Sequence, residues 1–223
     1  VFQEEDPLMA PNADHILDCQ GQIYPAPILA AEKELGVMAA GKVLEVITTD
    51  ANTRPDLRTW ASKVGVEIVE ITAADESGRY SFFVRKSAQV SARTDTAAAT
   101  DESRLFLVVL KTGFEYTPIV RSAFMYAALA AAMEFETVVY CVQAGADTMV
   151  AGKIDALDES KPGKPTIRQR FSEALEMGVR VEVCEQTANV RGIAADDLVA
   201  GVELRGGAVL IDYASRAVGQ LSF

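Results

Sequence analysis

The chain has 223 residues, of which 49% are hydrophobic and 24% are charged, so it can form one large domain or two smaller ones and is not of the disordered class. Its net charge of -11 repels nucleic-acid backbones and anionic membrane surfaces, and we expect neither as a partner. No apolar run reaches the roughly 20 residues of a membrane-spanning helix. The first residues lack a basic region followed by an apolar stretch, so we expect no signal peptide and a cytoplasmic location.

The first half predicts the order β-α-β-α-β-β, which is typical of a two-layer α/β sandwich. Pro27 suits the first turn of a helix, and Gly65 is placed to end a second helix. The expected strands are His15–Leu17, Val43–Thr48, Glu67–Thr72 and Tyr80–Lys86. The expected helices are Pro27–Met38, with Ile28, Leu29, Ala31, Leu35 and Met38 on its apolar face, and a segment that follows Pro55 and contains Leu57, Trp60, Ala61 and Val64.

Residues 87–103, with the sequence SAQVSARTDTAAATDES, are small and polar and have no apolar period. This composition predicts a flexible linker. We therefore expect a first domain at residues 13–86 and a second domain at residues 104–223.

The second half alternates strands and helices, which predicts a mostly parallel sheet covered on both faces, a three-layer α/β domain. The expected strands are Leu105–Leu110, Thr137–Val142 and Val179–Cys184. One helix is expected to use Thr117 as its cap, with Pro118 at its first position, and to extend to Met133. Another begins with a capping box of Thr166 and Gln169 and ends at Gly178. Residues 143–165 are expected to form a mobile loop with a short helical piece.

The reactive side chains are few. The three cysteines, Cys19, Cys141 and Cys184, are too scattered for a disulfide framework or a zinc site, so we expect reduced thiols. His15 is the single histidine, which excludes most catalytic triads and metal sites, and we interpret it as a strand-end residue. Glycine-rich phosphate-binding motifs are absent from the sequence, so no cofactor is expected.

Cys184 is the strongest candidate for chemistry. It ends the strand VRVEVC, and the carboxyl ends of parallel strands are where such sheets hold their sites. The start of a following helix and the cation of Arg191 would favour its thiolate, which is the form that attacks a sulfane sulfur. A buried, unreactive thiol is the alternative that position alone leaves open. For Cys141 a core position is the favoured interpretation. Cys19 follows the first strand, where we expect it to be partly exposed and without a chemical role.

The first half resembles the TusA (SirA-like) family of sulfur carriers, whose signature is an Asp and a Gly before Cys-Pro-x-Pro. The residues in this frame are Asp18, Gly21, Tyr24, Pro25, Ala26 and Pro27, and the match continues through Gly41, Asp50 and Thr53 to cover about residues 13–86. Tyr24 stands where the family keeps its sulfur-accepting cysteine. A phenol cannot form a persulfide, so the resemblance implies a docking or packing domain without carrier chemistry.

The second half, over about residues 104–223, is similar to the DsrE family, which includes TusD-type subunits. The matching stretches are KTGFEYTPIVRSAFMYAALAAAM, GVRVEVCEQTANVRGI and ASRAVGQLSF. The resemblance implies that Cys184 is the sulfur acceptor, with Arg191 and Gly192 as the Arg-Gly pair of the next loop. Thr187 lies where some members have a second cysteine, so no internal dithiol step is expected. Relatives commonly form trimers or hexamers, so a homo-oligomer is expected.

Together the two resemblances imply a sulfur-relay protein, a possible sulfurtransferase, that carries sulfane sulfur as a persulfide on Cys184 between donor and acceptor proteins. Two alternatives stay open. One is a non-catalytic binding or scaffold protein, which the loss of the cysteine at Tyr24 favours. The other is a sensor that binds a small molecule beside Tyr24 in an inter-domain cleft.

Overall fold

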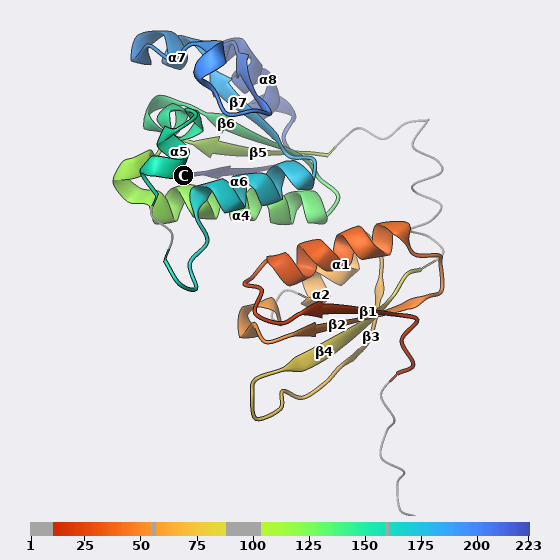
Figure 1. Cartoon of the computed structure of the whole chain (residues 1–223). Helices are drawn as coiled ribbons and strands as arrows, with labels where there is room; N and C mark the ends of the chain where they lie inside the picture. The colour runs from red at the N-terminus through yellow and green to blue at the C-terminus, as the bar shows by residue number, and fades with distance from the viewer. Residues whose placement is uncertain (1–10, 55–56, 88–103, 159–160) are drawn as a thin grey trace, which may run out of the picture. The chain divides into compact units, whose positions relative to one another are not determined.

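The computed structural model describes residues 11–54, 57–87, 104–158 and 161–223 (Figure 1). The chain divides into two compact units, Val1–Ala98 and Ala99–Phe223. The expected linker lies outside the described residues apart from Ser87, and so does Pro55. Within the described ranges, no helix is long and apolar enough to cross a membrane.

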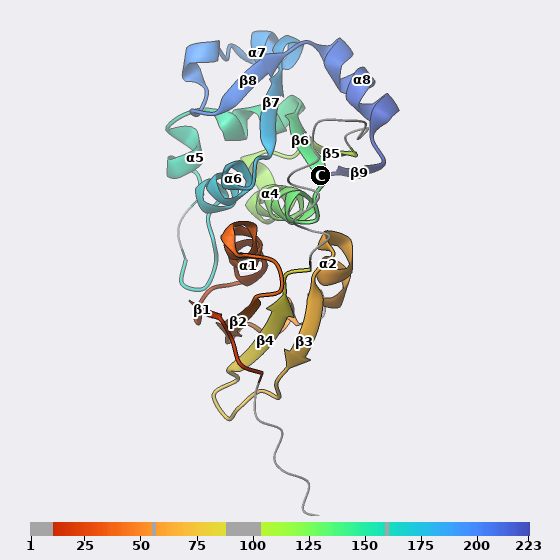
Figure 2. The same ribbon diagram turned by 90° about the vertical axis from the view of Figure 1, so that its right-hand side faces the viewer.

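The first unit has the predicted β-α-β-α-β-β order. Its described strands form one four-stranded sheet in the order β1-β2-β4-β3, with helices α1 and α2 on one face (Figure 2). The elements are β1 (His15–Cys19), α1 (Ala26–Val37), β2 (Val43–Thr48), the 3-10 turn η1 (Ala51–Thr53), α2 (Leu57–Val64), β3 (Glu67–Ile71) and β4 (Tyr80–Arg85). The predicted two-layer sandwich is confirmed.

The core of this unit lies between the helices and the sheet. Every apolar residue predicted to face inward from α1 and α2 is buried. Strands β1 and β2 are parallel, whereas β4 pairs antiparallel with both β2 and β3. Because β1 and β2 run in the same direction, the loops that follow Cys19 and Thr48 leave the same edge of the sheet.

The second unit is built on a parallel sheet. Its described strands pair in the order β8-β7-β6-β5-β9, and every recorded pairing is parallel. The strands are β5 (Leu105–Leu110), β6 (Glu136–Cys141), β7 (Arg180–Cys184), β8 (Val202–Arg205) and β9 (Gly219–Ser222). The helices are α4 (Thr117–Ala132), α5 (Lys153–Ala156), α6 (Ile167–Glu176), α7 (Glu185–Arg191) and α8 (Gly207–Arg216), with 3-10 turns η2 (Phe114–Tyr116), η3 (Gln143–Met149) and η4 (Ala195–Asp197).

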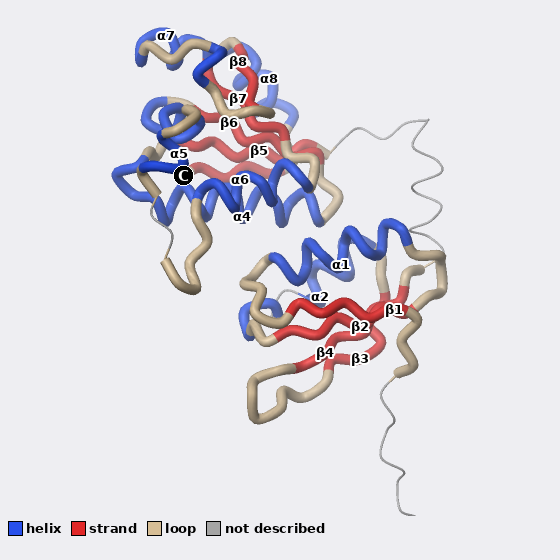
Figure 3. The backbone as a smooth tube through the Cα atoms, viewed as in Figure 1, coloured by secondary structure: helices blue, strands red, loops and turns tan. Residues whose placement is uncertain are grey.

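Helices cover both faces of this sheet, as Figure 3 shows, so the predicted three-layer arrangement is confirmed. Helices α4 and α6 lie on one face, where Phe124 and Phe171 meet edge to face with ring centroids 5.7 Å apart. On the other face, Leu105, Leu107 and Tyr140 pack with Tyr213 of α8. Burial on both sides explains why β5 and β6 are apolar along nearly their whole length.

Two local predictions need correction. Thr117 is the first residue of α4 rather than its cap, and Tyr116 precedes the helix without a side-chain capping bond. Part of the predicted mobile loop is packed: η3 and α5 bury Met149 and Ile154 completely, because these apolar side chains join the core. The Thr166–Gln169 capping box is present as predicted.

Candidate functional site

Cys184 lies where β7 passes directly into α7. It is the last residue of the strand and the N-cap of the helix, with the extended backbone that a cap residue requires. No loop separates the two elements, so the thiol stands beside the unpaired N–H groups of the first helical turn. This junction follows from the sequence, in which the alternating strand VRVEVC is followed at once by EQTANVR.

Several hydrogen-bond donors converge on the Cys184 sulfur. Burial opposes ionisation, but the backbone N–H and hydroxyl of Thr187, the backbone N–H of Gln186 and the hydroxyl of Tyr140 favour the thiolate and hold the pKa of Cys184 below its usual value. The thiol itself donates to Oε1 of Gln186 at 3.3 Å. The residue is 8% exposed. The site therefore favours an anionic sulfur while shielding it from solvent.

Tyr140 reaches this site from the neighbouring strand β6. Its hydroxyl lies 2.9 Å from the carbonyl oxygens of both Arg205 and Gly206. Its ring packs at 76° against that of Tyr213, with the centroids 6.4 Å apart. Burial and the adjacent Cys184 raise the pKa of Tyr140, so the phenol stays protonated and can donate a hydrogen bond.

Thr187 links the sulfur to the loop after β6. Its Oγ1 lies 3.5 Å from the backbone nitrogen of Gln143, which donates to it. Gln143 has a positive φ of 52°, an uncommon conformation for a residue other than glycine. The bond from Gln143 leaves the Thr187 hydroxyl proton free to point at the sulfur.

Arg191 and Gly192 lie at the opposite end of α7. Gly192 adopts the left-handed conformation that ends the helix. The Arg191 guanidinium pairs with Asp147 of η3, with Nε 2.8 Å from Oδ2. Seven residues of helix span about 10 Å, and Cys184 and Arg191 stand at opposite ends of α7. The Arg191 guanidinium therefore pairs with Asp147 and does not contact the sulfur.

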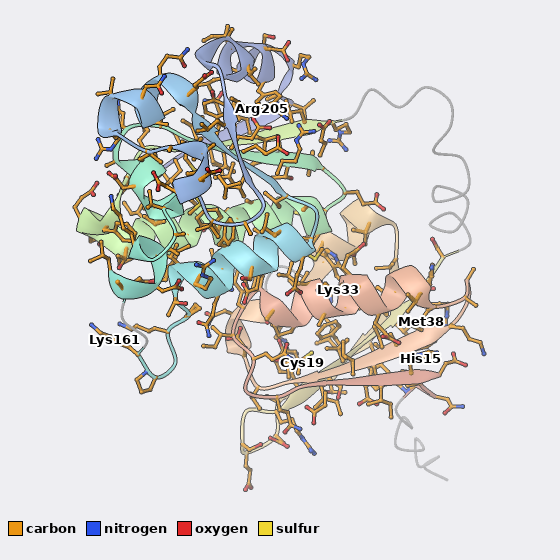
Figure 4. All side chains as sticks on the ribbon, turned by 45° about the horizontal axis from the view of Figure 1, so that its top comes forward. His15, Cys19, Lys33, Met38, Lys161 and Arg205 are labelled. Atoms are coloured by element: carbon orange, nitrogen blue, oxygen red, sulfur yellow. The ribbon has the colours of Figure 1, made fainter. Side chains whose placement is uncertain are left out.

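The other two thiols are sealed in the cores. Cys141 ends β6 and is fully buried, and this burial raises its pKa. Cys19 ends β1, and Figure 4 shows it between α1 and the strands. Burial, together with the neighbouring Asp18, raises the pKa of Cys19 to about 11. Cys141 has the core position predicted for it, whereas Cys19 is fully buried and not partly exposed as expected.

The residues of the TusA-like motif, Tyr24 to Pro27, lead into α1. The Tyr24 N–H donates to Oδ2 of Asp50 at 2.5 Å, across the two parallel strands. Pro25 occupies the N-cap position of α1 without a side-chain capping bond, and Pro27 is buried near the start of that helix. Asp50 is also the N-cap of η1, because its side chain accepts a hydrogen bond from the backbone N–H of Asn52. His15, at the start of β1, is exposed and pairs with Glu34 at 2.8 Å, as a strand-end residue.

Sequence reasoning missed three residues of the Cys184 site: Tyr140, Gln186 and Thr187. The strand register that brings Tyr140 near Cys184 is not visible in the sequence. Gln186 and Thr187 could have been found, because the second and third residues after an N-cap regularly approach its side chain. In the described part of the chain, no group of three or more metal-ligating side chains occurs.

The fold and the site define a two-unit α/β protein that holds a thiol at a strand-to-helix junction. Residues 104–223 match the family model described as the DsrE/DsrF-like family, and residues 15–86 match the model described as Sulfurtransferase TusA. The chain therefore belongs to the DsrE/DsrF-like family and carries a TusA domain fused on its N-terminal side, the fusion that the sequence predicts.

Similar proteins include relatives of the whole chain and of each half. The uncharacterized protein MJ0760 of Methanocaldococcus jannaschii is 28% identical over 92% of this chain and 72% of its own length. The sulfur carrier protein TusA of Allochromatium vinosum is 39% identical over 33% of this chain and 95% of its own length. Among solved structures, the ychN protein from E. coli is 18% identical, covers 54% of this chain and 99% of its own, and has a TM-score of 0.44.

Proposed function

We propose that the protein works in a sulfur relay and carries sulfane sulfur as a persulfide on Cys184. The observation that carries the proposal is the set of donors around one sulfur atom, which lowers the pKa of the Cys184 thiol in spite of its burial. A thiolate is the nucleophile that attacks a sulfane sulfur. The TusA relatives named as sulfur carriers support the same general role.

The transfer balances without an external oxidant or reductant. The Cys184 thiolate attacks the outer sulfur of a donor persulfide, R–S–SH. A bond forms between Sγ and that sulfur, the donor S–S bond breaks, and the donor leaves as the thiolate R–S⁻. In the second step an acceptor thiolate attacks the outer sulfur of Cys184–S–SH and regenerates the Cys184 thiolate.

The residues around the sulfur receive roles in this proposal. The Thr187 and Tyr140 hydroxyls and the N–H groups of Gln186 and Thr187 stabilise the negative charge on sulfur before and after transfer. Arg191 acts at a distance, because its pairing with Asp147 holds η3, whose first residue donates to Thr187. Arg191 is therefore a positioning residue rather than a contact of the sulfur.

The partners are proposed to be a donor persulfide protein and an acceptor thiol protein. We place the relay in the cytoplasm, where the three unpaired thiols would stay reduced, and we expect a homo-oligomer, a trimer or a hexamer. For the TusA domain we propose docking of a partner, because Tyr24 replaces the thiol and the buried Cys19 has a raised pKa.

The test is sulfur loading followed by intact-mass measurement. After incubation with a polysulfide under conditions that load a TusA carrier, the wild-type chain should gain the mass of one sulfur atom on the Cys184 peptide. Cys184→Ser should gain none, whereas Cys141→Ala, which removes the buried thiol of the adjacent strand, should still load. An unmodified wild-type chain under these conditions would favour the alternative, a scaffold protein without carrier chemistry.

A further inference from the structure

The side chain of Gln186 joins the Cys184 sulfur to the start of α8. Its Oε1 accepts the thiol hydrogen of Cys184 at 3.3 Å and the backbone N–H of Gly207 at 2.9 Å. Gly207 is the first residue of α8 and follows Gly206, the N-cap, which offers no side chain to hold the turn. One amide oxygen thus serves two donors from different elements.

A second group, the Tyr140 hydroxyl, contacts the same turn. The Tyr140 hydroxyl lies within hydrogen-bond distance of the carbonyl oxygens of Arg205 and Gly206, the two residues that connect β8 to α8. The same hydroxyl also favours the Cys184 thiolate as a donor. A phenol carries one hydrogen, so full donation to the sulfur weakens donation to the two carbonyl groups. The hydrogen bonds that Gln186 and Tyr140 make to the β8–α8 turn therefore both depend on whether the Cys184 sulfur is protonated.

We propose that Gln186 is a positioning residue that couples the chemical state of the Cys184 sulfur to the β8–α8 turn, residues 205–207, and loosens this turn when the sulfur is ionised or loaded. For the loaded state, the inference rests on the sulfur-carrier function proposed above. For the ionised state it needs only the thiol.

The coupling follows from the loss of one donor. A neutral thiol donates to Gln186 Oε1, but a thiolate or the inner sulfur of a persulfide has no hydrogen and turns lone pairs toward that oxygen. The repulsion is relieved if the amide rotates and presents its NH₂ group to the sulfur. The Gly207 N–H then loses its acceptor, and the Tyr140 hydroxyl turns to the anion at the same time.

When the β8–α8 turn loosens, a sulfur donor or acceptor can reach the Cys184 sulfur, which the turn otherwise shields. Cys184 is 8% exposed in the closed arrangement, and an added sulfur atom needs room beside it. Apart from the hydrogen bonds at the β8–α8 turn, α8 packs on the sheet through apolar contacts of Val209, Leu210 and Tyr213 farther along the helix. Residues 205–207 can therefore move while these three side chains hold the helix in place.

Other titratable groups face this region and must be separated from the sulfur in any test. Tyr140 faces it from β6 and Glu182 from β7, Arg205 pairs in register with Cys184 from β8, and Tyr213 of α8 donates to Glu182 at 3.0 Å. Cys184→Ser leaves all four in place. A serine hydroxyl still donates to Gln186 and does not ionise near neutral pH, so this variant is the matched control.

The experiment follows the Gly207 amide in the full chain by ¹⁵N–¹H NMR and hydrogen exchange across the pH range in which Cys184 ionises, and again after polysulfide loading. In the wild type, the Gly207 shift should titrate together with the alkylation rate of Cys184, and its exchange, corrected for the intrinsic pH dependence, should become about fivefold faster, as expected for the loss of one ordinary hydrogen bond. In Cys184→Ser the amide should not respond.

Two variants of Gln186 complete the test. Gln186→Glu keeps an acceptor for Gly207 but cannot present an NH₂ group to the sulfur, so Gly207 should stay protected while the Cys184 alkylation curve moves to higher pH. In Gln186→Leu the Gly207 amide should be unprotected at every pH. A wild-type Gly207 amide that stays unchanged while Cys184 ionises would overturn the coupling. A Gly207 that titrates in a chain that takes up no sulfur would support the coupling and refute the carrier function.

Discussion

The two units of the chain use the same local design with different chemistry. In each, a parallel strand ends near a helix start, after Cys19 in the first unit and at Cys184 in the second. In the second unit a thiol receives hydrogen bonds from the helix N-terminus and from Tyr140. In the first unit Tyr24 occupies the equivalent place in the TusA motif, and the only nearby thiol, among the residues described, is the buried Cys19. Similar strand-to-helix connections can thus hold different side chains.

The largest expected effect is the gain of a second sulfur site in Tyr24→Cys. Tyr24 is partly exposed, and its backbone is already held by Asp50, so a thiol at this position needs no rearrangement of the turn. Incubation with polysulfide should add the mass of two sulfur atoms, one of them on the peptide that contains residue 24. Tyr24→Ser removes the phenol without supplying a thiol and should load only one. If Tyr24→Cys also loads only one, the first unit has lost more than its cysteine.

The next effect compares the three native thiols by alkylation against pH. The pKa of Cys184 is lowered, whereas burial raises that of Cys19 to about 11 and raises that of Cys141 as well. A lower pKa gives more thiolate at a given pH, so near neutral pH the Cys184 peptide should label at least about a hundredfold faster than the other two. Its rate should level off at the lowest pH of the three. Equal alkylation rates for the three cysteine peptides in the folded chain would contradict the lower pKa of Cys184.

Thr187 tests which contacts lower the Cys184 pKa. Thr187→Val removes the hydroxyl donor but keeps the shape and the backbone N–H, and hydrogen bonds to charged groups contribute about 1.5–3 kcal/mol. The pKa of Cys184 should therefore rise by about one unit, which reduces the thiolate fraction near neutral pH about tenfold. Thr187→Ser retains the hydroxyl and should restore the wild-type alkylation curve. A Thr187→Val curve that overlies the wild type would assign the lowered pKa to the backbone amides and the Tyr140 hydroxyl.

The sequence predicted those parts of the fold that depend on local signals. The Thr166–Gln169 capping box, the apolar face of α1 and the strand that ends at Cys184 each follow from residues close together in the chain. Strand β8 was not predicted, although the alternation of Val202 to Arg205 between two glycines is a strand signal. The neighbours of Cys184 across the sheet could not be predicted, because the contact with Tyr140 depends on strand register.

The difference between local sequence signals and contacts set by the tertiary structure also explains why Arg191 was predicted beside the Cys184 sulfur but pairs with Asp147. Its place after the cysteine and before Gly192 matched the DsrE pattern, and a cation near a thiol is a sound electrostatic expectation. The sequence could not show that α7 extends through Arg191 and directs the guanidinium toward Asp147. A helix one turn shorter would have given a different site from the same residues.

Arg191→Gln carries the smallest expected effect and decides whether this arginine acts on the sulfur directly. Partial burial opposes ionisation of Asp147, but its bonds with Arg191 and Lys153 lower its pKa. A carboxyl with a lowered pKa stabilises the fold above its unfolded value near 3.9, and this contribution is lost as the pH falls through the folded value. The pair is partly exposed, so the variant should lose at most about 1 kcal/mol of unfolding free energy at neutral pH, and the difference should vanish in acid.

The alkylation curve of Cys184 should move little in Arg191→Gln, because the guanidinium lies at the far end of α7. Arg168→Gln breaks the exposed pair with Asp155 and serves as a control for the loss of an arginine ion pair elsewhere in the same unit. A shift of the Cys184 pKa as large as that of Thr187→Val would mean that Arg191 leaves Asp147 and stabilises the thiolate itself. The second unit would then use a mobile cation to stabilise its thiolate. The contacts described around Tyr24 in the first unit include no such cation.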